Sequence, residues 1–314
     1  RSDIDALCVK EETGLAFASE HEGRMHACGH DCHMAMALGT ATVLSKIKER
    51  LKGNIKFVFQ PAEEGPGGAK PMIAAGVMEN PKVDYSIGCH VWPDLPEGTV
   101  GVKAGPLMAA MDRFDIRIIG KGGHGAMPHL CVVALEVGTQ VVGAPQRVVS
   151  RHMKPLNPAV VTVGSFHAGT AFNVIPGEAE LCGTTRTFDR EVWLSWPERI
   201  ERVVRGVCLS MGAEYRFKYS QGYPPLVNND AMAGIVKRCA GQVVGPENVV
   251  EPEPTMGGED MAFFLERSQG CFFFLGVGFE GCAGVHNSKF NVNEKNLLTG
   301  IEIYAHAALN LLSA

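Results

Sequence analysis

The chain has 314 residues, of which 46% are hydrophobic and 20% are charged, the usual balance of a globular protein. Its formal net charge is -5 with acids and bases interspersed, so no basic stripe is present to hold a phosphate backbone, and we expect no nucleic-acid partner. No apolar run approaches the roughly 18 residues of a membrane helix, so we expect no membrane span or membrane partner. The length exceeds that of one comfortable core and predicts two domains.

The first 111 residues predict alternating helices and strands. Apolar periodicity indicates helices over 34–51 and 69–78, and strands over 54–60 and 83–89. This alternation is typical of an α/β domain with a doubly wound, mostly parallel sheet, which binds ligands beyond the carboxyl ends of its strands. The chain opens on Arg1, directly in a strand pattern, so we expect that the N-terminal part of this domain is missing.

The middle of the chain predicts a different order of elements. Its strands and helices follow the βαββαβ order of a ferredoxin-like fold, with strands over 114–119, 159–167, 179–188 and 214–219 and helices over 132–150 and 191–211. The remainder returns to an α/β pattern, with helices over 230–243 and 294–312 and a strand over 271–278. We therefore expect a discontinuous catalytic domain of residues 1–111 and 224–314, with residues 112–223 inserted as a second domain.

The ten cysteines are scattered between Cys8 and Cys282 without a regular framework. A chain of this size does not need disulfides to hold its core. We therefore expect free thiols and a cytoplasmic location.

The densest chemical motif is MHACGHDCH, residues 25–33, which places three histidines, two cysteines and an aspartate in nine residues. Imidazole and thiolate are ligands of zinc and similar borderline-soft ions, whereas a calcium or magnesium site would consist of oxygen atoms. We take Cys28 and His30 as the candidate ligands. His26, Cys32 and His33 are equally well interpreted as residues that support the ligands or that begin a helix.

Three further segments offer metal-binding side chains at predicted strand ends. Glu63 and Glu64 follow one strand in a loop rich in Pro and Gly, His90 follows the next, and His286 follows the apolar run FFFLGVG. Cys28, His30, one of the two glutamates, His90 and His286 give five donors. Five donors exceed one tetrahedral site, so two neighbouring divalent ions are expected. The paired glutamates suit metal-assisted hydrolysis, because one carboxylate can bind an ion while the other moves a proton from water to a leaving amine. Zinc fits the cysteine best, with manganese, cobalt and nickel as alternatives.

Eight segments resemble a known family in the same order along the chain. They are DIDAL, MHACGHD, FQPAEEG, GCHVWP, GKGGHGAMPH, FNVIPGEAELCGTTRTF, GGED and the His286 segment. Together they resemble hippurate hydrolases, within the aminoacylase-like dinuclear metallopeptidases that include auxin-conjugate hydrolases. The resemblance implies that Cys28, His30, Glu64, His90 and His286 bind the metals. It also implies that Glu63 is the general base for a metal-bound hydroxide.

The resemblance also assigns roles to residues of the inserted domain, which is a lid and a dimerisation domain in this family. His124 matches a residue that reaches the active site of the partner and stabilises the oxyanion, which implies a homodimer. Asn173 and Arg186 match substrate-binding residues, the arginine through the substrate carboxylate, although Arg186 alone is also interpretable as a surface residue. Asp5 and Asp260 match carboxylates that support the metal ligands.

These roles predict metal-dependent hydrolysis of the amide bond of N-acyl amino acids, such as hippurate-like or N-acetyl compounds. A dipeptidase or a carboxylesterase would use the same site, because only the pockets distinguish their substrates. A third alternative is a truncated, non-catalytic relative that binds metal or metabolites. Retention of Glu63 beside the whole ligand set favours catalysis over binding alone.

Overall fold

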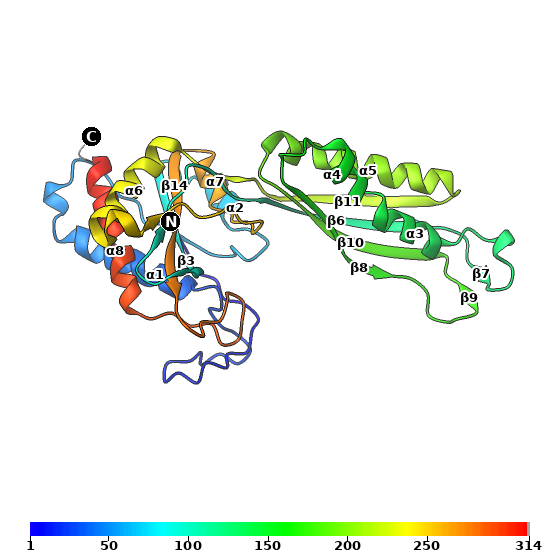
Figure 1. Ribbon diagram of the computed structural model, residues 1–314, viewed down its shortest axis with the longest axis horizontal. Coiled ribbons are helices and arrows are strands. Elements are labelled where there is room, and N and C mark those ends of the chain that lie inside the picture. Colours follow the sequence, from blue (N-terminus) through cyan, green and yellow to red (C-terminus); the bar gives the residue numbers. More distant parts are fainter. Residues whose placement is uncertain (313–314) are drawn as a thin grey trace. The chain divides into compact units, whose positions relative to one another are not determined.

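A computed structural model describes residues 1–312, which form two compact units (Figure 1). Unit 1 comprises Arg1–Leu107, Leu226–Pro254 and the chain from Glu259 onward, and unit 2 comprises Met108–Pro225 and Thr255–Gly258. The expected boundaries lie within a few residues of these, except at 255–258. This short segment joins unit 2 because the Ala109 amide donates to the carbonyl oxygens of Thr255 (3.1 Å) and Gly257 (2.9 Å). A loop without apolar periodicity carries no sequence signal of such pairing.

The main sheet of unit 1 is mixed. Its four strands lie in the order β13 (Val249–Val250), β4 (Val100–Gly101), β14 (Gln269–Gly278) and β3 (Tyr85–Pro96). The pairs β14/β3 and β13/β4 are parallel, whereas β14/β4 is antiparallel. Strand β14 is buried on both faces, with Phe272, Phe273 and Phe274 all fully inaccessible. A continuous apolar run is the expected sequence of such an interior strand.

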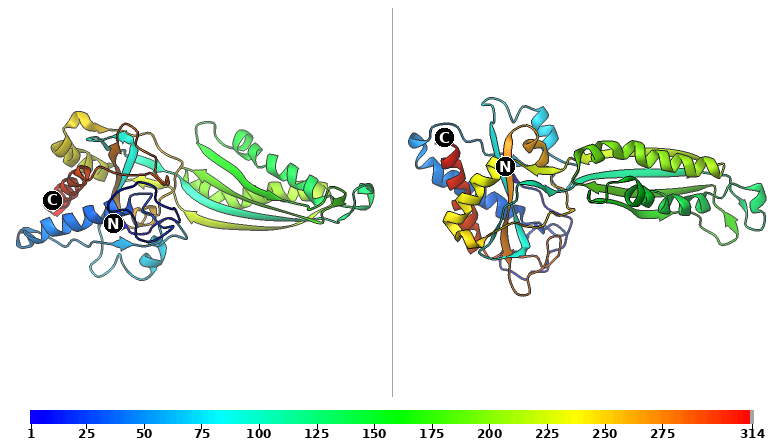
Figure 2. Two further views of the ribbon diagram at one scale, coloured as in Figure 1. Left: turned by 90° about the horizontal axis from the view of Figure 1, so that it is seen from below. Right: turned by 45° about the horizontal axis from the view of Figure 1, so that its top comes forward.

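Two shorter strand pairs and a set of helices complete unit 1. Strand β1 (Ser2–Asp3) pairs in parallel with β2 (Phe59–Gln60), and β5 (Gly105–Met108) pairs with β12 (Leu226–Asn228). The helices are α1 (His30–Ser45), α2 (Ala69–Ala74), α6 (Asp230–Val244), α7 (Ala262–Leu265) and α8 (Lys295–Leu312), with short 3-10 turns at Lys48–Arg50 and Pro246–Asn248. Helix α8 packs against α1 and α6 (Figure 2).

Four expected elements of unit 1 have different bounds, one of them the helix expected over 69–78, which ends at Ala74. The strand expected over 54–60 is regular only at Phe59–Gln60, because a strand needs a partner and β1 pairs with only these two residues. Strand β3 continues to Pro96 because β14 pairs along its whole length, so His90 lies inside a strand and does not follow its end. Helix α1 begins at His30 and not at residue 34, directly after Gly29 in the left-handed conformation (φ 82°).

Unit 2 has a four-stranded antiparallel sheet in the order β11-β6-β10-β8. Along the chain its elements are β6 (Ala110–Ile119), β7 (Gly123–His124), a 3-10 turn at Pro128–Leu130, α3 (Ala134–Gly143), α4 (Gln146–His152), β8 (Ala159–His167), β9 (Val174–Ile175), β10 (Glu178–Thr187), α5 (Arg190–Ser210) and β11 (Glu214–Tyr223). The main strands and helices thus follow a βαββαβ order, with the first helix divided. The single helix expected over 132–150 ends at Gly143 and resumes at Gln146, because Pro145 lacks an amide hydrogen and disfavours helix at the preceding residue.

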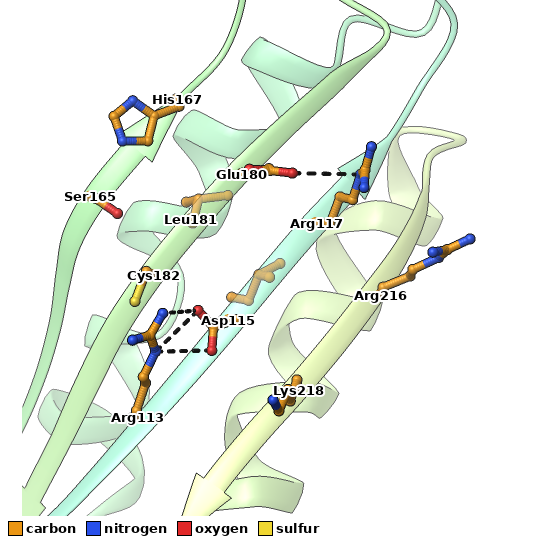
Figure 3. Close-up of a pocket in the computed structure, with 11 residues that line it drawn as sticks. Arg113, Asp115, Arg117, Ser165, His167, Glu180, Leu181, Cys182, Arg216 and Lys218 are labelled. Carbon is orange, nitrogen blue, oxygen red and sulfur yellow. Dashed lines mark hydrogen bonds and ion pairs between the residues drawn. The ribbon is translucent and has the colours of Figure 1, made fainter. Parts of the chain in front are cut away.

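The two faces of this sheet differ because side chains alternate along a strand. Phe114, Ile116 and Ile118 of β6 pack into a core with residues of α3, α4 and α5. The other face carries Arg113 and Asp115, among other charged residues (Figure 3). None of the helices in the described part of the chain is both long and apolar enough to cross a bilayer.

Candidate active site

Cys28 and His30 enter the site from the start of α1. Cys28 is 7% exposed and His30 is 1% exposed, and Gly29 lies between them. A Cβ atom at Gly29 would lie 2.3 Å from Cγ2 of Val91 on β3. The glycine therefore supplies both the left-handed turn and the close approach of this loop to the strand that carries His90.

The ring nitrogens of His30 and His90 are oriented by backbone carbonyls. Nδ1 of His30 lies 3.0 Å from the carbonyl oxygen of Asp5, and Nδ1 of His90 lies 2.6 Å from that of Val91. A carbonyl oxygen only accepts hydrogen bonds, so each histidine carries a proton on Nδ1, and Nε2 is the nitrogen through which each could bind a metal ion. Nε2 of His90 lies 3.4 Å from Sγ of Cys28. Nε2 of His30 is buried and has no hydrogen-bond partner among the described residues.

Glu63 and Glu64 lie in the turn after β2, where the Asp5 carboxylate holds their backbone. Its two oxygens accept hydrogen bonds from the amides of Glu63 (3.1 Å) and Glu64 (3.0 Å), and one lies 3.3 Å from Nδ1 of His30. Asp5 thus contacts both the glutamate pair and a histidine of the cluster. Such carboxylates commonly orient the ligands of a metal site.

His286 lies beside Glu64. Its Nε2 lies 3.1 Å from Oε1 of Glu64, which is an ion-pair distance, and this buried oxygen makes no hydrogen bond with the described residues. His286 has a positive φ of 66°, and its amide donates to the carbonyl oxygen of Ala27 at 2.6 Å. A non-glycine residue in this conformation costs free energy and is commonly found at functional sites.

The five expected metal ligands, Cys28, His30, Glu64, His90 and His286, form a five-residue cluster, and together with Glu63 they make overlapping groups of donor atoms. The groups whose donors all lie within 4.8 Å of one another include Cys28, His30 and His90; Cys28, Glu64 and His286; and His30, Glu63 and Glu64. Because Cys28 belongs to the first two groups, the cluster is wider than one ion and has a sulfur atom at its middle. The sulfur, nitrogen and oxygen donors and the two unpartnered atoms fit a pair of divalent cations.

Burial dominates the protonation of the cluster. It raises the pKa of the Cys28 thiol far above its usual value, with a further contribution from the charge of Glu64, and it lowers the pKa of His90 to about 3. Burial and repulsion by Glu259 raise the pKa of Glu63, although Arg1 opposes them. His30 has a pKa of about 9, because the hydrogen bond to Asp5 and nearby carboxylates outweigh the effect of burial. A bound cation would favour the thiolate and the neutral imidazoles.

A buried group of charged residues lies behind Glu63, and Asp260 is the only member of it that the sequence analysis assigned to the site. The Arg1 guanidinium lies 2.8 Å from Asp3, 3.0 Å from Glu259 and 2.6 Å from Asp260. Asp260 also accepts hydrogen bonds from the side chain of Gln60 and from the amide of Ala69. One carboxylate oxygen of Asp260 lies within 4.8 Å of carboxylate oxygens of Glu63 and Glu259. The hydrogen bonds of Asp260, however, come from residues outside the five-residue cluster. Asp3 had a sequence signal, since it lies two residues before Asp5 in DIDAL.

The remaining expected site residues lie in unit 2. His124 lies on β7 opposite Val174 of β9, and the carbonyl oxygen of Asn173 accepts from the amide of Gly125 at 2.8 Å. Nδ1 of His124 accepts from the Ala126 amide at 3.1 Å, so Nε2 carries the proton and is a donor. Arg186 lies on β10, and its guanidinium makes no hydrogen bond or ion pair with the described residues. Burial lowers the pKa of Arg186, and Asp112 opposes this effect.

Comparison with known proteins assigns this chain to a family. Residues 1–310 match the model of peptidase family M20/M25/M40. The chain is 52% identical over 231 residues to an N-acyl-L-amino acid amidohydrolase of Geobacillus stearothermophilus, covering 73% of this chain and 62% of that protein. It is 41% identical to thermostable carboxypeptidase 1 of Saccharolobus solfataricus, covering 98% of this chain and 78% of that protein.

A solved structure agrees with these sequence matches. A protein of Bacillus subtilis described as a dinuclear metal-binding peptidase of the M20 family superposes with a TM-score of 0.83 at 37% identity, covering 99% of this chain and 80% of that one. The expected relationship to amidohydrolases and dinuclear metallopeptidases is thereby confirmed. The chain belongs to peptidase family M20/M25/M40 and is an enzyme of the amidohydrolase and metallopeptidase class.

Proposed function

We propose that this enzyme hydrolyses the amide bond of N-acyl amino acids at a two-metal site formed by Cys28, His30, Glu64, His90 and His286. The observation that carries the proposal is the convergence of these donors from four separate chain segments, with Nε2 of His30 and Oε1 of Glu64 buried without hydrogen-bond partners among the described residues. A buried polar atom without a partner is costly, so its retention favours a ligand at that place.

Cys28 supports zinc as the resident ion, since thiolate is a softer ligand than carboxylate, while manganese, cobalt and nickel accept the same donors. When bound, the two ions supply Lewis-acid polarisation of the scissile carbonyl and make a water molecule more acidic. The protein contributes the orientation of the ligands: Asp5 holds the backbone of the glutamate turn, and carbonyl oxygens fix the proton of His30 and His90 on Nδ1.

Glu63 is the proposed general base. It neighbours Glu64 in the turn, and one of its carboxylate oxygens lies within 4.8 Å of a ring nitrogen of His30 and of a carboxylate oxygen of Glu64. Burial raises its pKa above the ordinary value. A carboxylate with a raised pKa accepts a proton from the attacking water more readily, and can then return it to the leaving nitrogen. Glu259, close behind Glu63, contributes to this elevation through charge repulsion.

Arg186 is the proposed partner of the substrate carboxylate. Its guanidinium is half-buried and makes no ion pair with the described residues, which leaves a planar donor for a free acid group. Such a contact would select N-acyl amino acids over amides that lack a terminal carboxylate. Asn173, which precedes β9 and accepts a hydrogen bond from the amide of Gly125 beside His124, is proposed to bind the substrate of the partner subunit.

The length of that sheet supports a homodimer in which a partner subunit supplies His124. Strand β10 carries Arg186 near its end, about 26 Å from its start at 3.3 Å per residue, and β7, the strand to which His124 belongs, lies beyond that start (Figure 1). This separation exceeds the length of an N-acyl amino acid. Arg186 and His124 of one chain therefore cannot both contact one substrate molecule, whereas two copies could each supply one of them. Nε2 of His124, a donor, suits a developing oxyanion.

The central experiment replaces Glu63 with Gln in metal-loaded protein. Wild-type and variant would be assayed on hippurate, several N-acetyl amino acids, a dipeptide and a simple ester, with the metal content of each measured. We expect the variant to lose hydrolysis by roughly 100-fold to 10,000-fold while it keeps its metal, because general-base removal usually costs this much. The substrate ranking separates an amidohydrolase from a dipeptidase or a carboxylesterase. Equal inactivity of both proteins on every substrate would favour a non-catalytic metal-binding relative.

The partner's contribution has its own test by mixing two inactive variants. Glu63→Gln and His124→Ala would be purified separately, exchanged under conditions that allow subunits to recombine, and assayed on the best substrate. A mixed dimer should contain one site with both Glu63 and His124, so activity should return to a fraction of the wild-type value. Persistent inactivity of mixtures that demonstrably form mixed dimers would reject a partner-supplied histidine.

A further inference from the structure

We propose that His33 is a positioning residue of the metal site, and that with Asp3 it holds strand β3 in the register that presents His90. The inference rests on the proposed function, because it concerns the same metal ligands. It assigns a role to a histidine that the sequence left open between a support and a helix start.

The hydrogen bonds of His33 determine where its proton lies. Nδ1 lies 2.6 Å from Oδ1 of Asp3, and the amide of Val91 donates to Nε2 at 2.9 Å. An amide N–H is only a donor, so Nε2 must be unprotonated and Nδ1 must carry the proton that Asp3 accepts. His33 is thus neutral with both ring nitrogens in use. Although its donors lie within 4.8 Å of those of Asp3 and His30, His33 has no lone pair left for a metal ion.

The Val91 amide links this histidine to the ligand. Val91 follows His90 on β3, and the Val91 carbonyl oxygen accepts from Nδ1 of His90, which leaves Nε2 of His90 for Cys28. The rings of His33 and His90 also touch edge to face, with centroids 4.7 Å apart and an interplanar angle of 69°. His33 therefore restrains both the backbone and the ring of His90.

Asp3 is itself held in place. It is fully buried, and its second oxygen accepts from the Arg1 guanidinium at 2.8 Å. A buried carboxylate requires such a charged partner. The bonds thus run in sequence from Arg1 through Asp3 and His33 to the backbone beside His90, and each member is almost inaccessible to solvent.

The inference can be tested through the metal rather than through hydrolysis. Apo proteins carrying His33→Ala, His33→Gln and His33→Asn would be titrated with Co²⁺, whose absorption bands report both affinity and coordination geometry, and zinc affinity would be measured by competition. We expect His33→Ala to lower metal affinity 10-fold to 100-fold, the usual effect of losing such a support, and to shift the cobalt bands. Gln should restore more than Asn, because only Gln can place an acceptor near Nε2 for the Val91 amide.

A matched control on the same helix separates positioning from stability. Thr40 is buried on α1, and its hydroxyl donates to the Met36 carbonyl oxygen at 2.8 Å, without contact to a metal ligand. Thr40→Ala should destabilise the fold measurably and leave cobalt affinity within about 2-fold of wild type, below the 10-fold loss expected at a supporting residue.

Two results would overturn the inference. One is a wild-type cobalt spectrum and affinity in His33→Ala, and the other is an equal loss of affinity in Thr40→Ala. Should His33→Ala not fold, the comparison of Gln with Asn decides, and equal affinities in these two variants would reject the proposed role. If wild-type protein binds two cobalt ions but hydrolyses no substrate, the proposed function fails while this test stands.

Discussion

Each unit of this protein buries a group of polar side chains, and the two groups differ in how completely their atoms are bonded. In unit 2, Asp112 is 3% exposed and accepts hydrogen bonds from Trp193 Nε1 (3.0 Å), the Gly222 amide (2.8 Å) and the Tyr219 hydroxyl (2.7 Å). Thr185 bonds the same hydroxyl at 2.6 Å. In unit 1, by contrast, His30 and Glu64 each keep a buried atom without a hydrogen-bond partner among the described residues.

This contrast separates a structural network from a ligand site. Burial raises the pKa of Asp112, while three neighbouring donors oppose that rise and satisfy both of its oxygens. One buried donor of unit 2, Trp196 Nε1, also has no partner in the described chain, but it is a single N–H in an apolar core. The two buried atoms of unit 1 that lack hydrogen bonds, Nε2 of His30 and Oε1 of Glu64, instead belong to a cluster of sulfur, nitrogen and oxygen donors that could bind a metal ion. Removing residues from each group should therefore have different consequences.

The largest effect is expected from Cys28→Ala, which removes the donor shared by two groups of ligands. Activity should fall by roughly 1,000-fold or more, because metal ions stabilise the transition state by several kcal/mol and each ~1.4 kcal/mol is a factor of ten. Elemental analysis should show less than the wild-type metal content. Cys89→Ala, a change at a buried cysteine beside His90, is the control and should keep its metal. Full metal content in Cys28→Ala would remove this residue from the site.

The next effect is on stability and concerns Asp112→Ala. The change leaves the indole of Trp193, the hydroxyl of Tyr219 and the amide of Gly222 without their acceptor, at a cost of about 3 kcal/mol in the free energy of unfolding. Urea denaturation measures this cost, and metal content should not change. Asp112→Asn keeps one acceptor oxygen and should cost less. A loss of bound metal in either folded variant would contradict the separation of the two groups.

Asp5→Asn should weaken the metal site without emptying it. The amide retains only one acceptor oxygen for the two backbone donors of Glu63 and Glu64, so one of them loses its bond. Metal affinity should fall about 10-fold to 100-fold, as is usual for residues that support ligands. Competition with a chromophoric chelator measures the change. An affinity equal to that of wild type would show that the turn holds its shape without Asp5.

The smallest effect is expected on the stability of the fold at acidic pH, through Glu97, which bonds residues at the start of α8. Hydrogen bonds from Lys295, Asn293 and Asn296 lower the pKa of Glu97 from its usual 4.5 to about 2. A carboxyl whose pKa is lowered on folding stabilises the fold fully above about pH 4.5, and this contribution is lost as the pH falls toward 2. The difference in Tm between wild type and Glu97→Gln should therefore shrink as the pH decreases through this window. A difference that stays constant would show that the charge of Glu97 does not stabilise the fold.

The sequence predicted the two-part organisation and the donors because both have local signals. The apolar run of β14 and the alternation along β6 follow from side-chain periodicity, and the MHACGHDCH motif concentrates ligand types in one segment. Strand 54–60 and the end of β3 were misjudged because their bounds depend on pairing with distant strands. His90 consequently lies inside a strand, although the side chain still reaches Cys28.

The sequence by itself determined which atoms were available: a thiol, three imidazoles and two adjacent carboxylates, in segments that end or border strands. Only the tertiary structure decided that Nδ1 of His30 and of His90 bonds a backbone carbonyl, that His33 is fully hydrogen-bonded, and that Arg1, Asp3 and Glu259 lie together behind Glu63. The physical reason is that a tautomer and a pKa depend on the nearest polar atoms in space. In this protein those atoms come from residues as distant in sequence as Arg1 and Asp260.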